Sequence, residues 1–521
     1  MSRPALDEPT GAERLREPPT EASSSDRWTA EWLSWAMIAA AGLVFLTWLF
    51  LAAVHVDDRY QLDHVSGARM ALAQHFNDGT LYPELYDGRL YGGTRFMPIP
   101  IVVHGLIARV TGEYLVSGKL VSYAFMAALA ATMFVLLRRL RCPSAFAVAL
   151  PALVLTTDTG LSGSMNARAD VLPLLLQVIS VGLVASTPRR APTIAAGALA
   201  GLAFMSKLSA VWAPLAIVIW LFARDRKRLP VFVATFVVTA GALLALFSVI
   251  TDGRIFENVF GLSTSGIKGL RSVLLTPYRF VHLMVDQMTM AWAVIPFVLL
   301  AAWISARSPA VSIWLVSLLC ALAVVLVVLT DVGTGFNQLI DIVVLIAIVI
   351  GEFVGRLRDE HTAIERGTAR ILQIGIALAL LWVTLSGLAV TFGPDVETTL
   401  QGEVSFDAEP LAALDTAPRS LLSDDPYVPV SLGQVPVVLD AFMLPRLAEE
   451  HPNAIPDFVE RIDDREFDLI VLVEPLEPVE RPWWTEQHFG IDVARAMSRA
   501  YTYVGRMQGY HLYEPNADTA T

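Results

Sequence analysis

The chain alternates long apolar runs with short polar segments, a pattern that predicts membrane-spanning helices. About 20 apolar residues are needed for a helix to cross a hydrocarbon core about 30 Å thick. The runs lie near residues 33–54, 117–137, 144–158, 168–186, 191–205, 209–223, 230–250, 287–304, 310–330, 338–354 and 371–391. If each run crosses once, the chain has about eleven transmembrane helices, and its two termini lie on opposite sides of the membrane.

Two parts of this count stay open. The segment FMPIPIVVHGLIARV, residues 96–110, is apolar but short and holds two prolines. We expect it to be an interfacial or re-entrant piece, because counting it as a span would break the alternation of basic loops. The runs 191–205 and 209–223 are also short and meet at Ser206-Lys207. Without these two runs nine crossings remain, with the same sidedness.

Basic residues fall in alternate loops, which predicts the orientation. They are Arg138, Arg139 and Arg141, then Arg189 and Arg190, then the run 224–228, then Arg307, and finally Arg356 through Arg370. Loops rich in Lys and Arg stay in the cytoplasm. The N-terminus is therefore predicted to be cytoplasmic and the C-terminus extracytoplasmic.

The two ends of the chain differ from the middle. Residues 1–30 are polar and rich in Pro, Glu and Ser, which predicts a disordered cytoplasmic segment. Residues 31–392 form the predicted transmembrane domain, with a first outer loop at 55–116. Residues 393–521 predict a small extracytoplasmic α/β domain without a Gly-rich phosphate loop.

Inside that last domain, short apolar runs predict strands and periodic segments predict helices. We expect strands at VPVVLD (435–440) and FDLIVLV (467–473), and a closing hairpin at 501–513. We expect helices near 454–464 and 491–500.

Composition supports a polytopic membrane protein. Of 521 residues 55% are hydrophobic and 17% are charged, and the mean hydropathy is +0.54, whereas soluble domains average about 25% charged residues. The net charge of −12 argues against nucleic acid as a partner. Cys142 and Cys320 are the two cysteines, too few for a disulfide framework or a cysteine metal site.

Unusual polar residues collect in the predicted outer loops. Asp57 and Asp58 stand where the first apolar run ends, and the later outer segments hold Asn166, Arg168 and Asp170, Lys207, Arg254 and Arg271, and Asn337 and Asp341. Ionisable groups at the edge of the hydrocarbon region are costly and tend to be functional. The pattern therefore predicts a polar cavity at membrane level.

Simpler interpretations exist for several of these residues. Adjacent acids such as Asp57 and Asp58 are often only solvated, and Asp63 suits the N-cap of a helix formed by HVSGARMALAQHF. Arg254 and Arg271 are expected to be solvated loop charges when each is considered alone.

The simpler interpretation of Arg168 and Asp170, two residues apart, is that they pair with each other within one helix and have no further role. Lys207 is harder to explain in this way. It lies between two short apolar segments, and an unpaired ammonium group in lipid is costly in free energy. We therefore expect Lys207 to have an anionic partner.

Several of these motifs, in this order, resemble the bacterial GT-C glycosyltransferases, a group related to protein O-mannosyltransferases and the aminoarabinose transferase of lipid A. The resemblance covers roughly residues 33–515. It rests on HVDDRY, LYPELYDGRLYGGTRFMPIPIVVHGLIARVTG, NARADVLPLLLQV, GALAGLAFMSKLSAVWAPLAIVIWLF, TGFNQLIDIVVLIAIVIG, LLSDDPYVPVSLGQVPVVLDAF, RIDDREFDLIVLV and YTYVGRMQGYHLYEP.

The resemblance implies an inverting transfer of a sugar from a polyprenyl phosphate, in the bacterial inner membrane, to an extracytoplasmic hydroxyl. The acceptor is then a lipid, a glycan or a protein. The family uses an Asp or Glu of the first outer loop as general base. This corresponds to Asp57 or Asp58, and the choice between them stays open.

The chemistry fits the residues on its own terms. A carboxylate beside another carboxylate and near the membrane is expected to have a raised pKa, which makes it a better base. Cations stabilise the departing phosphate, and the candidates are Lys207 and Arg168, followed by Arg254 and Arg271.

Asn166, Asp170, Asn337 and Asp341 are candidates for positioning the substrates, and Asn337 and Asp341 lie four residues apart on one helical face. No cofactor is predicted, because two adjacent acids are too few ligands to predict a divalent cation.

A transporter of a lipid-linked or anionic envelope precursor is the main alternative. Such a protein is expected to carry ionisable groups near the midplane, inverted repeats and broken helices. Here the charges fall at the outer ends of the runs, and no repeat between the halves is visible. An envelope scaffold is the third alternative, and it would need neither Asp57, Asp58 nor Lys207.

Overall fold

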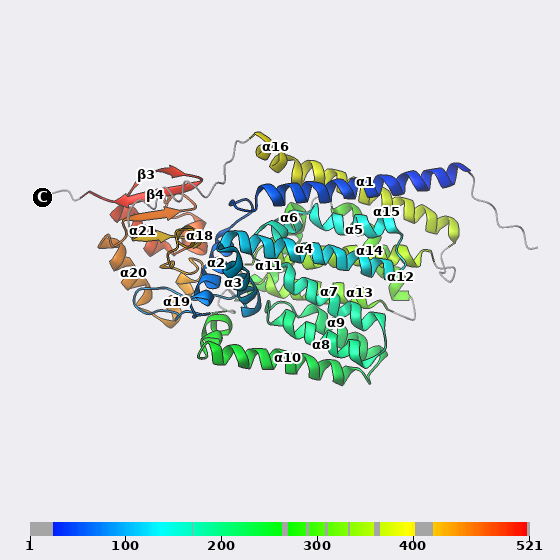
Figure 1. The fold of residues 1–521 in the computed structure, drawn as a ribbon, viewed down its shortest axis with the longest axis horizontal. Helices are drawn as coiled ribbons and strands as arrows, with labels where there is room; N and C mark the ends of the chain where they lie inside the picture. The colour runs from blue at the N-terminus through cyan, green and yellow to red at the C-terminus, as the bar shows by residue number, and fades with distance from the viewer. Residues whose placement is uncertain are drawn as a thin grey trace, which may run out of the picture.

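The computed structural model of the chain describes residues 24–168, 170–262, 269–287, 291–307, 311–331, 334–358, 365–401 and 420–517. Most of these residues form a helix bundle, and a smaller domain with a four-stranded sheet lies at one end of it (Figure 1). Side chains are described from residue 31 onward.

The bundle and its outer loops contain helices of very different lengths. They are α1 (Ser24–Val54), α2 (His64–Asn77), α3 (Pro98–Thr111), α4 (Tyr114–Arg139), α5 (Ser144–Leu155), α6 (Asp158–Met165), α7 (Val171–Ser186), α8 (Arg190–Phe204), α9 (Trp212–Arg224), α10 (Leu229–Ile250), η1 (Phe256–Gly261), α11 (Gly269–Gln287), η3 (Ala291–Val294), α12 (Ile295–Arg307), α13 (Ile313–Val328), η4 (Phe336–Gln338), α14 (Leu339–Arg356), α15 (Arg366–Gly387), η5 (Leu388–Phe392) and α16 (Gly393–Gln401).

In the described residues, each of the eleven predicted apolar runs is helical over most of its length, so the polytopic helical fold is confirmed. Five helical stretches in the described residues are long and apolar enough to cross a membrane alone: Glu31–Val54, Tyr114–Arg139, Leu229–Ile250, Phe336–Arg356 and Arg366–Gln401. Most of the others are 10–17 residues long, so the number of crossings stays a prediction.

The run 144–158, counted as one crossing, is not a single straight helix. α5 ends at Leu155, and α6 follows at an angle of 76°. The break has a local cause, because the hydroxyl of Thr157 accepts a hydrogen bond from the Gly160 amide and caps α6. The polar sequence TTDTG therefore starts a new helix.

The positions of two loops and of the sheet domain can be compared with the predicted topology. Two of the predicted cytoplasmic loops touch each other, because Arg228 Nη1 donates to the Thr187 carbonyl at 2.8 Å. The sheet domain lies at the opposite end, beside α2 and α3 (Figure 1). These two loops thus lie at the same end of the bundle, as predicted, while the orientation in a membrane stays a prediction.

The sheet domain contains four strands in the order β1-β2-β4-β3. Its elements are β1 (Leu421–Ser423), α18 (Tyr427–Ser431), α19 (Leu444–Glu450), α20 (Ala454–Asp463), β2 (Leu469–Leu472), η7 (Trp483–Gln487), α21 (Ile491–Ala500), β3 (Tyr501–Met507) and β4 (Tyr510–Pro515). β1 pairs with β2 in parallel, and the other two pairings are antiparallel. The predicted strand at 467–473, both predicted helices and the closing hairpin are confirmed.

The predicted strand at 435–440 is wrong. This segment makes one isolated bridge, between Val438 and Tyr91, and the strand that pairs with β2 is β1 instead. The apolar run VPVVLD covers the first outer loop here and does not extend the sheet.

The sheet domain and the first outer loop share one core. The Tyr91 amide donates to the Val437 carbonyl at 2.8 Å, and the Tyr91 carbonyl accepts from the Leu439 amide at 2.9 Å. Arg59 Nη1 donates to the Gln508 carbonyl at 2.9 Å. Tyr91 is buried in the same apolar cluster as the α20 side chains. The outer loop is therefore held between the bundle and the domain.

Candidate active site

The loop that follows α1 carries a fixed carboxylate, Asp58. One oxygen contacts His55 Nδ1, and the other accepts from the Tyr60 amide at 2.9 Å. Lys119 Nζ lies 3.3 Å from the same second oxygen and also donates to the His55 carbonyl. The Lys119 side chain comes from α4 and has no exposed surface. Asp58 is therefore held by three groups from two segments of the chain.

These contacts reverse the expected direction of the Asp58 pKa. Burial raises the pKa of the carboxyl, but the His55 hydrogen bond, the Lys119 charge and the Tyr60 amide together lower it below its usual 3.8. The prediction of a pKa raised by a neighbouring acid is thus wrong for Asp58. Asp57, by contrast, is exposed and makes no hydrogen bond or ion pair with any described residue.

Helix α16 covers this loop from the C-terminal end of the bundle. His55 Nε2 lies 2.8 Å from the Thr399 hydroxyl, and the Tyr60 hydroxyl donates to Asp395 Oδ2 at 2.5 Å. Burial and the Asp395 carboxylate raise the pKa of Tyr60 far above its usual value, so this hydroxyl stays a donor. The loop is consequently tied to both α4 and α16.

A second cluster of charges surrounds the buried carboxylate of Asp170. Lys207 Nζ lies 3.4 Å away, Arg69 Nη2 lies 3.6 Å away, and Asn337 Nδ2 donates at 3.1 Å. Burial raises the Asp170 pKa, but Lys207, Arg69 and Arg168 outweigh it and lower the pKa well below the usual value. The expected anionic partner of Lys207 is therefore confirmed as Asp170.

Arg168 does not pair with Asp170 as the sequence suggested. It forms an ion pair with Asp63, whose carboxylate also caps α2 by accepting from the Ser66 amide at 2.9 Å. The Arg168 backbone amide donates to Asn166 Oδ1 at 2.9 Å. The predicted N-cap is thus confirmed, and the same carboxylate anchors an arginine.

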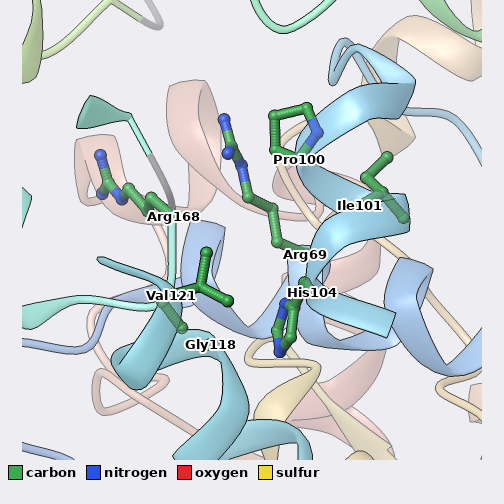
Figure 2. A pocket seen from close by; sticks show the side chains of 8 residues that line it. Arg69, Pro100, Ile101, His104, Gly118, Val121 and Arg168 are labelled. Carbon is green, nitrogen blue, oxygen red and sulfur yellow. The ribbon is translucent and has the colours of Figure 1, made fainter. Parts of the chain in front are cut away.

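Figure 2 shows a narrow site between these arginines and α4, which in this structure is too tight to hold a water molecule, so a phosphate would enter it only after the arginine side chains move apart. Arg69 and Arg168 line it together with His104, Gly118 and Val121. Lys119, which holds Asp58, stands between the last two of these residues in α4. The acidic loop and the arginine pocket therefore flank the same turn of one helix.

Two other predicted residues lie outside this cluster, and a third, Asp341, lies at its edge. Asp341 accepts from Trp212 Nε1 at 3.0 Å and interacts electrostatically with Lys207 and Asp170. Arg254 pairs with Glu84 at 3.2 Å on the exposed surface, and Arg271 is exposed on α11. The structure thus does not bring Arg254 or Arg271 to the pocket, because both stay solvated at the ends of their segments.

Two charged residues of the site were not predicted from the sequence. Arg69 belongs to α2, and its burial lowers its pKa. Lys119 is a lone cation inside the apolar segment LVSGKLVSY. The argument applied to Lys207 holds for Lys119 as well, since a buried lysine in such a segment requires an anionic partner.

No group of three or more His, Cys, Asp or Glu residues in the described ranges is placed to hold a metal ion. The two acids at the end of α1 also fall short of the ligand set that Ca²⁺ or Mg²⁺ prefers.

No protein-family model matches the sequence, and no curated protein matches it. The fold, however, is similar to that of solved membrane enzymes. ArnT from Cupriavidus metallidurans bound to undecaprenyl phosphate is 14% identical, with a TM-score of 0.58 over 93% of this chain and 98% of that one. Its apo form gives 15% identity and a TM-score of 0.59 over 96% and 100% of the two chains.

The apo Archaeoglobus fulgidus oligosaccharyltransferase is 12% identical, with a TM-score of 0.50 over 94% of this chain and 75% of that one. Both proteins are GT-C glycosyltransferases. The chain therefore has the GT-C fold of a polytopic membrane protein, as its motifs suggested.

Proposed function

We propose that this protein, with its GT-C fold, is an inverting glycosyltransferase that moves a sugar from a polyprenyl phosphate to an acceptor hydroxyl. The observation that carries the proposal is the arrangement around α4. An exposed carboxylate, Asp57, adjoins a fixed one, Asp58, and a pocket lined by Arg69 and Arg168 lies beside the same turn. The similarity to an ArnT structure that holds undecaprenyl phosphate supports this choice of donor.

Asp57 is the better candidate for the general base. A base has to reach the acceptor oxygen and must not be occupied by other partners. Asp58 fails this requirement because His55, Lys119 and the Tyr60 amide already engage it. We therefore assign Asp58 to positioning the loop, and Asp57 to accepting the proton.

The cation cluster is suited to the leaving phosphate. Arg69, Arg168 and Lys207 supply three positive charges, and Asp63 and Asp170 supply two negative ones. Among these ion-paired residues one positive charge is left over, and the buried Asp341 carboxyl lies near Lys207. Burial strengthens electrostatic interactions in such a site. Such pre-oriented cations stabilise the charge that develops on a departing phosphate.

The reaction follows from these roles. The acceptor oxygen attacks the anomeric carbon, and its proton passes to Asp57. The bond between the anomeric carbon and the phosphate oxygen breaks, and its electron pair leaves with the polyprenyl phosphate. One displacement inverts the configuration of the sugar. Asn166 and Asn337 hold Arg168 and Asp170 in place and so position the phosphate site.

This activity places the sheet domain on the extracytoplasmic side and the N-terminus in the cytoplasm of a bacterium, in line with the positive-inside rule. The break between α5 and α6 is a feature that a transporter would share, but the position of the charges argues against one. The ionisable clusters lie at the end of the bundle that meets the sheet domain, and a transporter is expected to place them at the midplane.

The test is transfer by purified wild type and by Asp57→Asn and Asp58→Asn, with a panel of polyprenyl-phosphate sugars and an envelope extract as acceptor. We expect Asp57→Asn to lose about 10²- to 10⁴-fold in kcat without loss of folding, the usual contribution of a general base. Asp78→Asn removes an exposed acid from the same outer loop and serves as the matched control.

Free polyprenyl phosphate is the readout. Full activity in Asp57→Asn contradicts the assigned base. A wild type that transfers no sugar but moves a lipid-linked precursor across vesicles contradicts the transferase itself.

A further inference from the structure

A groove runs along the outside of the bundle between α1 and the helices η5 and α16. Its volume is about 500 Å³, and its walls are mostly apolar. Leu43 and Thr47 form one wall, and the opposite wall consists of Leu388, Phe392, Gly393, Val396, Glu397, Leu400 and Gln401. The side chains of Leu43 and Leu400 are both more than half exposed, so the groove opens on the outer surface of the bundle.

The groove has the depth of one membrane leaflet. Leu43 lies twelve residues before His55, and Leu388 lies eleven residues before Thr399. At about 1.5 Å per residue, the wall from Leu388 to Gln401 is roughly 20 Å long, whereas α1 lines the groove at Leu43 and Thr47. Half of a hydrocarbon core is about 15 Å. An extended lipid chain of one leaflet therefore matches the length of the groove.

The upper end of the groove joins the candidate active site. α16 carries Val396 and Leu400 in the groove wall, and its Asp395 and Thr399 bind Tyr60 and His55. A lipid whose chain lies in the groove consequently has its head beside the loop of Asp57 and Asp58.

The mouth of the groove is acidic. Glu397 lines it, and Asp395, Asp57 and Asp58 lie around the loop above it. The nearby cations are engaged elsewhere, because Lys119 is buried beneath Asp58 and Arg59 of the same loop turns to the Gln508 carbonyl and the Tyr510 ring of the sheet domain. The arginine pocket opens between α2, α3 and α4. An anionic head group is therefore unfavourable at this mouth.

Helix α4 separates the groove from the arginine pocket. Trp48 of α1 contacts Tyr123 of α4 with ring centroids 6.0 Å apart, and α3 packs against another face of α4. In Figure 1, α1 and α16 lie on one side of α4, and α2 and α3 lie on the other. The two lipid-facing sites thus approach the acidic loop from different sides.

We infer that this groove binds the hydrocarbon chain of the acceptor, which is a lipid with a free hydroxyl and no phosphate in its head group. This inference rests on the proposed function, and it narrows the acceptor from a lipid, glycan or protein to a neutral lipid. The donor phosphate is excluded from the groove by the acidic mouth and is held by the arginine pocket.

Photo-crosslinking of the full-length protein in nanodiscs tests the inference. The probe is a diacylglycerol with a diazirine in one acyl chain, compared with a phosphatidylglycerol and a polyprenyl phosphate that carry the same group. We expect the diacylglycerol to label the segments around Leu43 and Val396 in preference to the two anionic probes.

Leu43→Trp and Leu400→Trp each place an indole in the groove. We expect each to lower the diacylglycerol labelling about tenfold, because the lipid chain would lose the burial of about two methylene groups. Leu46→Trp is the matched control, because Leu46 is 65% exposed on the same helix and lies outside the groove. Equal labelling by phosphatidylglycerol, preferential labelling by polyprenyl phosphate, or equal labelling of the Leu43→Trp and Leu46→Trp variants overturns the inference.

The two proposals fail in different ways. Asp57→Asn abolishes transfer if the proposed function holds and leaves the groove labelling unchanged. If the wild type transfers no sugar from any donor, the proposed function fails while the labelling still reports what the groove binds.

Discussion

Replacing Lys119 with Met removes a charge that Asp58 needs, and the size of the effect follows from the geometry. The two groups lie 3.3 Å apart, and the Lys119 side chain is fully buried. At an effective dielectric constant of about 20, two unit charges at this distance attract by about 5 kcal/mol. The cost of burying the Lys119 ammonium offsets part of this attraction, and Asp58 keeps its contacts with His55 and the Tyr60 amide. We therefore expect the free energy of unfolding to fall by about 3 kcal/mol, at the lower end of the range for breaking a buried ion pair.

The pH dependence provides a second readout. The lowered pKa of Asp58 means that the unfolded chain binds its proton more readily than the folded chain does. Asp58 therefore stabilises the fold above its usual pKa of 3.8, and this contribution is lost as the pH falls. Lys119→Met raises the pKa of Asp58, so the difference between wild type and variant should shrink as the pH falls below about 4.

The assay is thermal unfolding in detergent at neutral and acidic pH. A loss of about 3 kcal/mol lowers Tm by several degrees at about 2 °C per kcal/mol for a large chain. Lys227→Met, at an exposed position, is the control. Adding Asp58→Asn to Lys119→Met should restore part of the loss, because no unpaired carboxylate remains. Strictly additive effects of the two substitutions would refute the reasoning.

Two further predictions address the phosphate site and the domain contact. Lys207→Met should raise the KM for a polyprenyl-phosphate donor about 10- to 100-fold, which corresponds to the loss of one charge-assisted hydrogen bond. Arg254→Met is the control and should leave that KM unchanged. Similar KM values in the two variants would show that Lys207 does not bind the donor phosphate. Gly67→Ala should lower Tm, because its Cβ would meet the Tyr427 amide nitrogen at 2.6 Å between α2 and α18, at a cost of about 1–3 kcal/mol. Gly42→Ala meets no atom within 4 Å and should not lower Tm; equal Tm values for the two alanine variants would show that α2 is not in tight contact with α18.

Local signals in the sequence gave correct predictions where the chemistry of a single side chain requires one kind of partner. Asp63 was recognised as an N-cap because a short acidic side chain before a periodic segment satisfies free amides. Lys207 was expected to have an acidic partner because a lone cation in an apolar segment requires one. Neither argument depends on the rest of the fold.

Predictions that depended on long-range contacts were less successful. The partner of Arg168 is Asp63, 105 residues away, and the sequence gave no reason to prefer it over Asp170. The strand assigned to 435–440 failed for the same reason, since Leu421–Ser423 pairs with β2 in its place. Local patterns state which groups need partners, but only the folded chain determines which partner is within reach.

The bridge between Tyr91 and Val438 has a consequence for how the protein is made. Residues near 91 leave the ribosome early in synthesis, whereas the segment that fixes them follows about 350 residues later. The hydrogen bonds of Tyr91 to Val437 and Leu439 therefore form only when synthesis is almost complete. A chain that stops before residue 420 lacks these contacts, so the first outer loop receives its cover only at the end of translation.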